Sequence, residues 1–187
     1  FSPDHQQIAT AGLDTTICLW AAATGEKQQC LQGHSNAVRT VLFHPDGQLL
    51  LSAAMDGTVR EWDLATGEEV RQFKNRNANI NHLAISPDGR TILTGDRGRA
   101  ACLWDLTTGE QIRCYEENHG TLFAVAFHPD GRSFATGSND QTVRLWNLED
   151  GAEILALGGH TDRITQSVFS PDGGTVASVG LDATLHM

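Results

Sequence analysis

Ser52, His34 and Asp56 are the residue types of a hydrolase catalytic triad. In such a triad the histidine takes a proton from an exposed serine, and an oxyanion hole stabilises the intermediate. Ser52 lies between Leu51 and Ala53 in an apolar run, with no G-x-S-x-G nucleophile elbow around it. Similar histidine, serine and aspartate sets also recur along the chain. We therefore predict that the set is structural and that the chain has no catalytic residues.

Four cysteines form two equally spaced pairs, Cys18 with Cys30 and Cys102 with Cys114. Free thiols, disulfides and metal ligation are the alternatives. Four cysteines are few for a disulfide scaffold of 187 residues, and one Cys-x11-Cys spacing is a poor zinc signature. We expect small, buried free thiols and, from them, a cytoplasmic location.

Other polar motifs indicate turns rather than ligand sites. His44 and His128 each precede a proline at equivalent positions and lie too far apart to share a metal. Thr-Gly-Glu recurs at 24–26, 66–68 and 108–110 as turn chemistry, and no glycine-rich nucleotide motif is present. We predict no metal, no cofactor and no small-molecule substrate.

The charge balance narrows the class of partner. The chain has 13 basic and 23 acidic residues, a formal net charge of −10. No basic run marks a nucleic-acid or anionic membrane surface, and no apolar stretch approaches the roughly 20 residues of a membrane span. A soluble protein that binds other proteins is expected, with basic partners as one option.

One period of 42 residues organises the whole chain. Its five prolines are Pro3, Pro45, Pro87, Pro129 and Pro171, and its four tryptophans are Trp20, Trp62, Trp104 and Trp146. Within residues 37–73, four short apolar runs alternate with Pro-Asp-Gly, Asp-Gly and Thr-Gly turns. Such runs predict four antiparallel strands, which is the size of a propeller blade.

The dipeptides in this register resemble the WD-repeat family. They are Gly33-His34, Gly159-His160, Trp62-Asp63 and Trp104-Asp105, with Trp146-Asn147 as a near match. The resemblance implies an all-β partial β-propeller of about four and a half repeats, cut from a ring of roughly 300 residues. We expect one propeller domain over 1–187, comprising a partial blade at 1–36, blades at 37–78, 79–120 and 121–162, and a partial blade at 163–187.

The family resemblance also implies a hydrogen-bonded histidine, serine or threonine, aspartate and tryptophan network that braces each blade. By register the network residues are Thr10, Asp14 and Trp20; His34, Ser52, Asp56 and Trp62; Thr94 and Trp104; Thr136, Asp140 and Trp146; and His160, Ser178 and Asp182. The histidine position is Arg76 in the third repeat and Asn118 in the fourth, and the third aspartate position is Gly98.

The resemblance to the WD-repeat family also implies that partners contact the start of each first strand and the position just before the second turn. The partner-binding candidates are Arg39, Met55, Asn79, Asn81, Arg97, Thr121, Phe123, Asn139, Arg163 and Thr165. Arginine, aromatic and methionine side chains are enriched in protein interfaces. A sharper hypothesis is that the arginines bind an acidic or phosphorylated peptide.

Two functions follow as alternatives. The first is a non-enzymatic scaffold for protein–protein interaction, a regulatory or signalling module of a larger protein. The second is the propeller portion of a multidomain enzyme, attached to a kinase, ATPase or protease, or an enzyme with its site in the propeller channel. The sequence favours the scaffold.

Overall fold

The computed structural model describes residues 1–75 and 79–187, and every regular element in these ranges is a β-strand. The chain divides into two compact units, residues 1–80 and 81–187. This confirms the predicted all-β class, with four-stranded antiparallel sheets of a partial propeller. No helix in the described ranges is long and apolar enough to cross a membrane.

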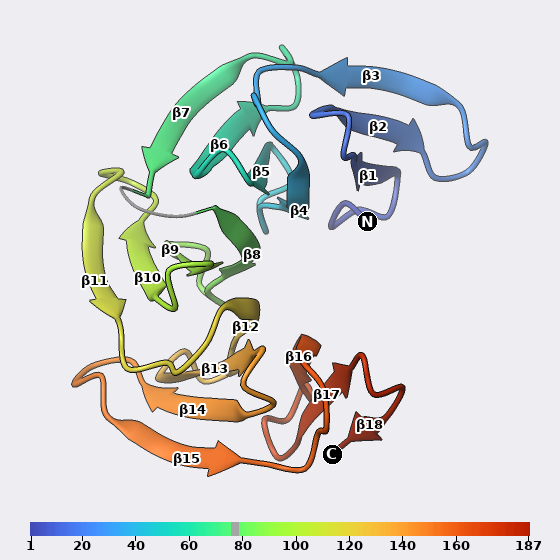
Figure 1. Cartoon of the computed structure of the whole chain (residues 1–187). Helices are drawn as coiled ribbons and strands as arrows, with labels where there is room; N and C mark the ends of the chain where they lie inside the picture. Colours follow the sequence, from blue (N-terminus) through green and yellow to red (C-terminus); the bar gives the residue numbers. More distant parts are fainter. Residues whose placement is uncertain (76–78) are drawn as a thin grey trace. The chain divides into compact units, whose positions relative to one another are not determined.

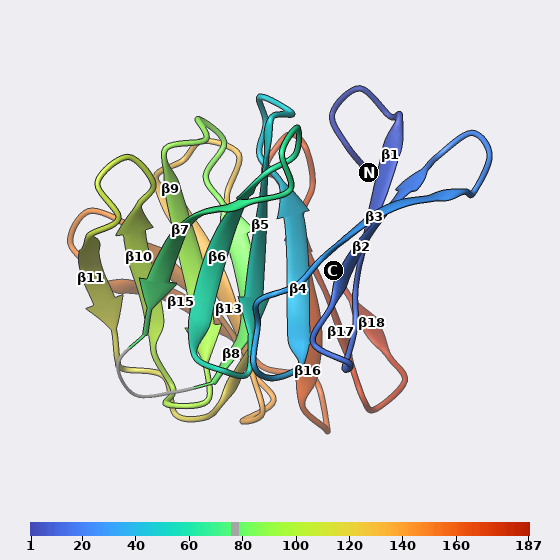
Figure 2. The same ribbon diagram turned by 90° about the horizontal axis from the view of Figure 1, so that it is seen from above.

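The first unit contains two sheets (Figure 1). One comprises β1 (Gln7–Ala11), β2 (Ile17–Ala21) and β3 (Lys27–Leu31). The other comprises β4 (Val38–Phe43), β5 (Leu49–Ala54), β6 (Thr58–Asp63) and β7 (Glu69–Lys74), which lie side by side in sequence order (Figure 2).

The second unit contains three sheets, the first of which begins at the division between the units. Its strands are β8 (Ile80–Ile85), β9 (Thr91–Asp96), β10 (Ala101–Asp105) and β11 (Gln111–Tyr115). The next comprises β12 (Leu122–Phe127), β13 (Ser133–Ser138), β14 (Val143–Asn147) and β15 (Glu153–Leu157). The last comprises β16 (Ile164–Phe169), β17 (Val176–Gly180) and β18 (Leu185–His186).

Each sheet is an up-and-down meander with the same register from repeat to repeat. The third strand begins opposite the end of the fourth, as Val59 pairs with Phe73 and Val143 pairs with Leu157. A bulge precedes each paired tryptophan, for example between Glu61 and Trp62. The repeated register places equivalent side chains on equivalent faces of every sheet.

The hairpin between the second and third strands of each repeat needs a left-handed residue. Gly57 has φ of 81° there, and Thr15, Arg99, Gln141 and Ala183 have φ between 60° and 73° at the equivalent positions. Glycine adopts this conformation without a steric cost, whereas residues with a Cβ do not. The turn is therefore conserved in geometry although its sequence varies within the chain.

The apolar core of each unit lies between neighbouring sheets. In the first unit, Ile17 and Leu31 of one sheet pack with Leu50 and Trp62 of the next. In the second unit, Tyr115 packs with residues including Leu93, Leu103, Leu122, Val125, Phe134 and Trp146 from two sheets. Full burial of one such large apolar side chain contributes roughly 1.5–3 kcal/mol, so each sheet depends on its neighbour for stability.

Candidate functional site

The second repeat contains a closed hydrogen-bond network across three strands and a loop. Nδ1 of His34 lies 2.9 Å from Oδ2 of Asp56, and Nε2 lies 2.7 Å from Oγ of Ser52. The indole N–H of Trp62 donates to the same Ser52 oxygen over 2.8 Å. With His34 protonated on Nδ1, the Ser52 hydroxyl donates to Nε2, and each of these groups has a partner.

The electrostatics of this network differ from those of a hydrolase. Ser52 is 0% exposed, so a substrate cannot reach its oxygen. Burial lowers the pKa of His34, which favours the neutral imidazole. Burial alone raises the pKa of Asp56, but hydrogen bonds from Thr58 and His34 bring it below its ordinary value. The arrangement suits a rigid brace between strands.

The fifth repeat has the same histidine geometry. His160 lies 2.8 Å from Asp182 through Nδ1 and 2.9 Å from Ser178 through Nε2. In the first repeat, the Trp20 indole donates to Thr10 over 2.9 Å. Asp14 instead accepts hydrogen bonds from the amide and hydroxyl of Thr16 in its own turn.

The third and fourth repeats depart from this pattern. The Trp104 indole donates to Thr94 over 3.1 Å, and that of Trp146 donates to Thr136 over 2.9 Å. Asn118 replaces the histidine and accepts the Thr136 hydroxyl proton over 2.9 Å. Asp140 does not face Asn118 in a comparable pair, because its carboxylate binds Arg144 at 2.7 Å. The third histidine position, Arg76, lies outside the described residues.

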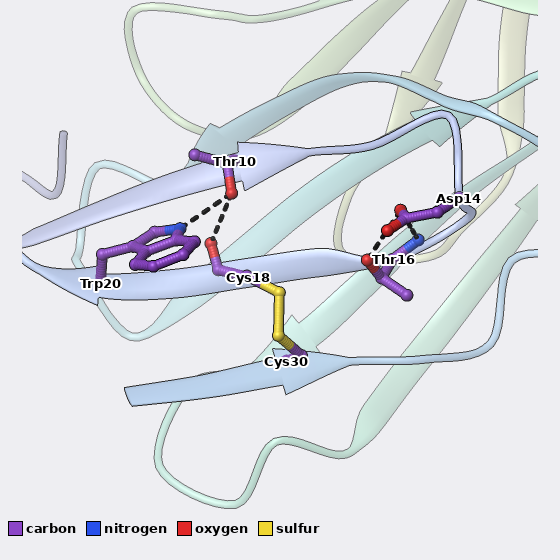
Figure 3. The surroundings of a disulfide bond; sticks show 6 residues. All are labelled: Thr10, Asp14, Thr16, Cys18, Trp20 and Cys30. Carbon is purple, nitrogen blue, oxygen red and sulfur yellow. Dashed lines mark hydrogen bonds between the residues drawn. A yellow bond between two sulfur atoms is a disulfide. The ribbon is translucent and has the colours of Figure 1, made fainter. Parts of the chain in front are cut away.

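The expectation of free thiols is wrong. Cys18 pairs with Cys30 across β2 and β3, and Cys102 pairs with Cys114 across β10 and β11, and a disulfide joins each pair. Figure 3 shows the first bridge beside Trp20 and Thr10. The Thr10 hydroxyl donates to the Cys18 carbonyl. The strand register is the sequence signal that predicts these disulfides, because residues directly opposite each other on neighbouring antiparallel strands have close Cβ atoms. A cytoplasmic location loses the support of free thiols, because disulfides favour oxidising compartments.

A second candidate site is an exposed surface of the second unit, hereafter the arginine patch. The Arg163 guanidinium lies 4.8 Å from the centroid of the Phe123 ring. The Arg163 carbonyl accepts the amide N–H of Leu181, a side chain that is 53% exposed. We define the arginine patch as Arg97, Thr121, Phe123, Asn139, Arg163 and Leu181.

Hydrogen bonds to backbone carbonyls connect the other members of the patch across repeats. The Thr121 hydroxyl donates to the Arg97 carbonyl over 3.4 Å, and the backbone N–H of Asn139 donates to the Thr121 carbonyl over 3.0 Å. Arg97, Asn139 and Arg163 are exposed, whereas Thr121 and Phe123 are half-buried. The patch thus combines arginine cations with an aromatic and an aliphatic side chain.

The remaining partner-binding candidates are distributed differently. Arg39 is exposed and Met55 is half-buried in the first unit, where the Asn79 side-chain amide donates to the Met55 carbonyl. Asn81 is 6% exposed and donates to the Leu122 carbonyl over 2.9 Å, so the structure gives it an internal role. The hydroxyl of Thr165 donates to the Val179 carbonyl over 3.2 Å, which ties β16 to β17.

Comparison with known proteins gives a family match along the chain. The family model described as WD domain, G-beta repeat matches residues 1–21, 25–63, 67–105, 109–147 and 151–187. A search of curated proteins finds no match.

Proposed function

Because the chain belongs to the WD-repeat family, whose repeats generally mediate protein–protein interaction, we propose that it is a non-enzymatic scaffold that binds partners through the arginine patch. Domains of this family are typically scaffolds without catalytic activity. The single observation that carries the proposal is the exposed Arg163 guanidinium over the Phe123 ring.

Several arginines in the described part of the chain are engaged in ion pairs with carboxylates, and the patch arginines are not among them. Arg60 pairs with Glu69, and Arg144 pairs with Asp140 and Glu153. Among the residues that the structure describes, no ion pair is recorded for Arg97 or Arg163. Exposed cations of this kind retain their capacity to bind a carboxylate or phosphate in two-pronged geometry.

The partner that fits this surface is an acidic or phosphorylated peptide segment with an adjacent apolar side chain. Its anion would bind the arginines, and its apolar side chain would contact Phe123 and Leu181. The Asp162 carboxylate borders the patch and accepts the Arg163 amide N–H, which favours a ligand anion placed away from that edge. A regulatory or signalling role for the protein follows if phosphorylation of the partner controls the contact.

The experiment that tests this function compares proteins captured by the wild-type chain and by two variants. Phe123→Ala with Arg163→Ala removes the central pair of the patch. Arg132→Ala removes an exposed arginine of the same unit that lies outside the patch. The proposal predicts specific partners that the patch variant loses and the Arg132 variant retains. Equal capture by all three chains contradicts it.

A further inference from the structure

The last repeat brings together three side chains that are common metal ligands. His160 precedes β16, Asp182 lies in the turn after β17, and His186 lies on β18. One potential ligand atom from each lies within 4.8 Å of the others. The structural network explains His160 and Asp182, but it does not explain the third side chain.

The orientation of His160 is fixed from its far side. Nε2 lies 2.9 Å from the buried Ser178 hydroxyl, and Nδ1 on the other side of the ring lies 2.8 Å from Oδ2 of Asp182. Ligating histidines in proteins ordinarily hydrogen-bond through the second ring nitrogen, which sets the tautomer and the ring plane. Ser178 supplies that bond here.

Asp182 is held as firmly as His160. Its Oδ2 accepts the Thr161 amide N–H over 2.8 Å, and its Oδ1 accepts the Thr184 amide and hydroxyl over 3.1 Å and 2.8 Å. These three hydrogen bonds fix the plane and direction of the carboxylate, which is therefore preoriented.

His186 completes the group from β18. The centroids of the His186 and His160 rings are 4.3 Å apart, and His186 Nε2 lies 3.1 Å from the Thr184 hydroxyl oxygen. That oxygen is also 3.2 Å from His160 Nδ1. The His186 ring lies against Gly159, where an added Cβ would meet it at 3.2 Å. Glycine at this position thus allows the ring to approach His160.

The second repeat provides an internal comparison at the same register. His34 and Asp56 repeat the histidine–aspartate pair at 2.9 Å, but Arg60 stands where the last repeat has His186. Arg60 lies against Gly33 as His186 lies against Gly159. An arginine cannot ligate a metal, so the exchange of one residue separates a purely structural network from a ligand set.

We propose that His160, Asp182 and His186 bind a divalent first-row transition metal, with Zn²⁺ as the reference ion. Two imidazole nitrogens and one carboxylate oxygen suit such ions, which bind these ligands at about 2.0–2.2 Å. The metal replaces the proton shared by His160 and Asp182, and that proton passes to solvent. The bound ion would attach β18 to the loop before β16, and the metal-bound fold would be more stable.

The test titrates the oxidised protein with Zn²⁺ by calorimetry and with Co²⁺ by visible absorption. His186→Arg places in the last repeat the arginine that the second repeat has at this position. Because His186 is exposed, the substitution leaves the buried core unchanged. His128→Ala is the matched control, because His128 lies beside Asp130 on another turn. We expect one ion per chain and a higher melting temperature with metal, both retained by His128→Ala and lost in His186→Arg.

The reverse substitution gives an independent readout. Arg60→His should create a second Co²⁺ site, because it reproduces the ligand set beside the His34–Asp56 pair. The absorption band of this site should be equivalent to that of the first. Absence of binding to the wild type, or equal binding by His186→Arg, would overturn the proposal. Circular dichroism of each variant without metal verifies that it is folded.

Discussion

Cys102 and Cys114 lie directly opposite each other on β10 and β11, and a disulfide joins them. This repeat has Gly98 where the second repeat has Asp56, so its hydrogen-bond network is incomplete. The third repeat thus carries a covalent link between its outer strands where the second has the Arg60–Glu69 ion pair.

The native protein is expected to expose no titratable thiol, and denaturation under reducing conditions is expected to reveal four. Each bridge closes a sequence separation of 12 residues, and loss of such a link costs roughly 3 kcal/mol in the chain-entropy description. Urea unfolding of Cys102→Ser with Cys114→Ser, compared with the wild type, measures the loss. Four reactive thiols in the native protein would contradict the disulfide assignment.

Replacement of Ser52 by alanine should destabilise the second repeat strongly. The indole N–H of Trp62 and Nε2 of His34 would both lose their partner in a dry environment. Each unsatisfied buried group costs about 1–3 kcal/mol. Urea unfolding gives the free-energy difference. Ser35→Ala, at an exposed position, serves as the control and should change stability little.

Stability should fall as the pH decreases from about 6.5 to about 4. Burial lowers the pKa of His82 from 6.5 to about 4, and its Nδ1 accepts the Val125 amide N–H, which requires an unprotonated nitrogen. The unfolded chain binds a proton in this window and the folded chain does not, so the contribution is complete only above pH 6.5.

Unfolding free energies measured at several pH values test this directly. The expected loss is roughly 3 kcal/mol across the window. His82→Gln should flatten the curve, and the remaining slope belongs partly to His34, whose pKa burial also lowers. A curve of unchanged slope in His82→Gln would exclude His82 as the titrating group.

Gln141→Gly should stabilise the second unit. Gln141 adopts φ of 72° in an exposed turn, where Gly57 stands in the second repeat. Relief of the left-handed strain contributes about 1 kcal/mol, partly offset by the greater freedom of glycine in the unfolded chain. Thermal melting measures the net effect, and the matched Gln48→Gly variant, outside such a turn position, should not raise the melting temperature.

The strand pattern was predictable because prolines, tryptophans and turn glycines repeat on one period. The bonding of the cysteines was not inferred, because composition outweighed the strand register that sets Cys18 opposite Cys30. The internal role of Asn81 depends on the Leu122 carbonyl, a contact between strands 41 residues apart that spacing alone does not reveal. The role of His186 as a candidate ligand could not be predicted from the sequence, because it depends on the turn that places its ring beside that of His160.

We propose that the arginine patch binds an anionic peptide segment. Fluorescence anisotropy with a pool of phosphoserine peptides tests it most directly, comparing Arg97→Ala with Arg163→Ala against the control pair Arg90→Ala with Arg132→Ala. Hydrogen bonds to charged groups contribute about 1.5–3 kcal/mol each, so the patch variant should bind at least about tenfold more weakly. The control should bind like the wild type, and equal affinity of the patch variant and the wild type would contradict the claim.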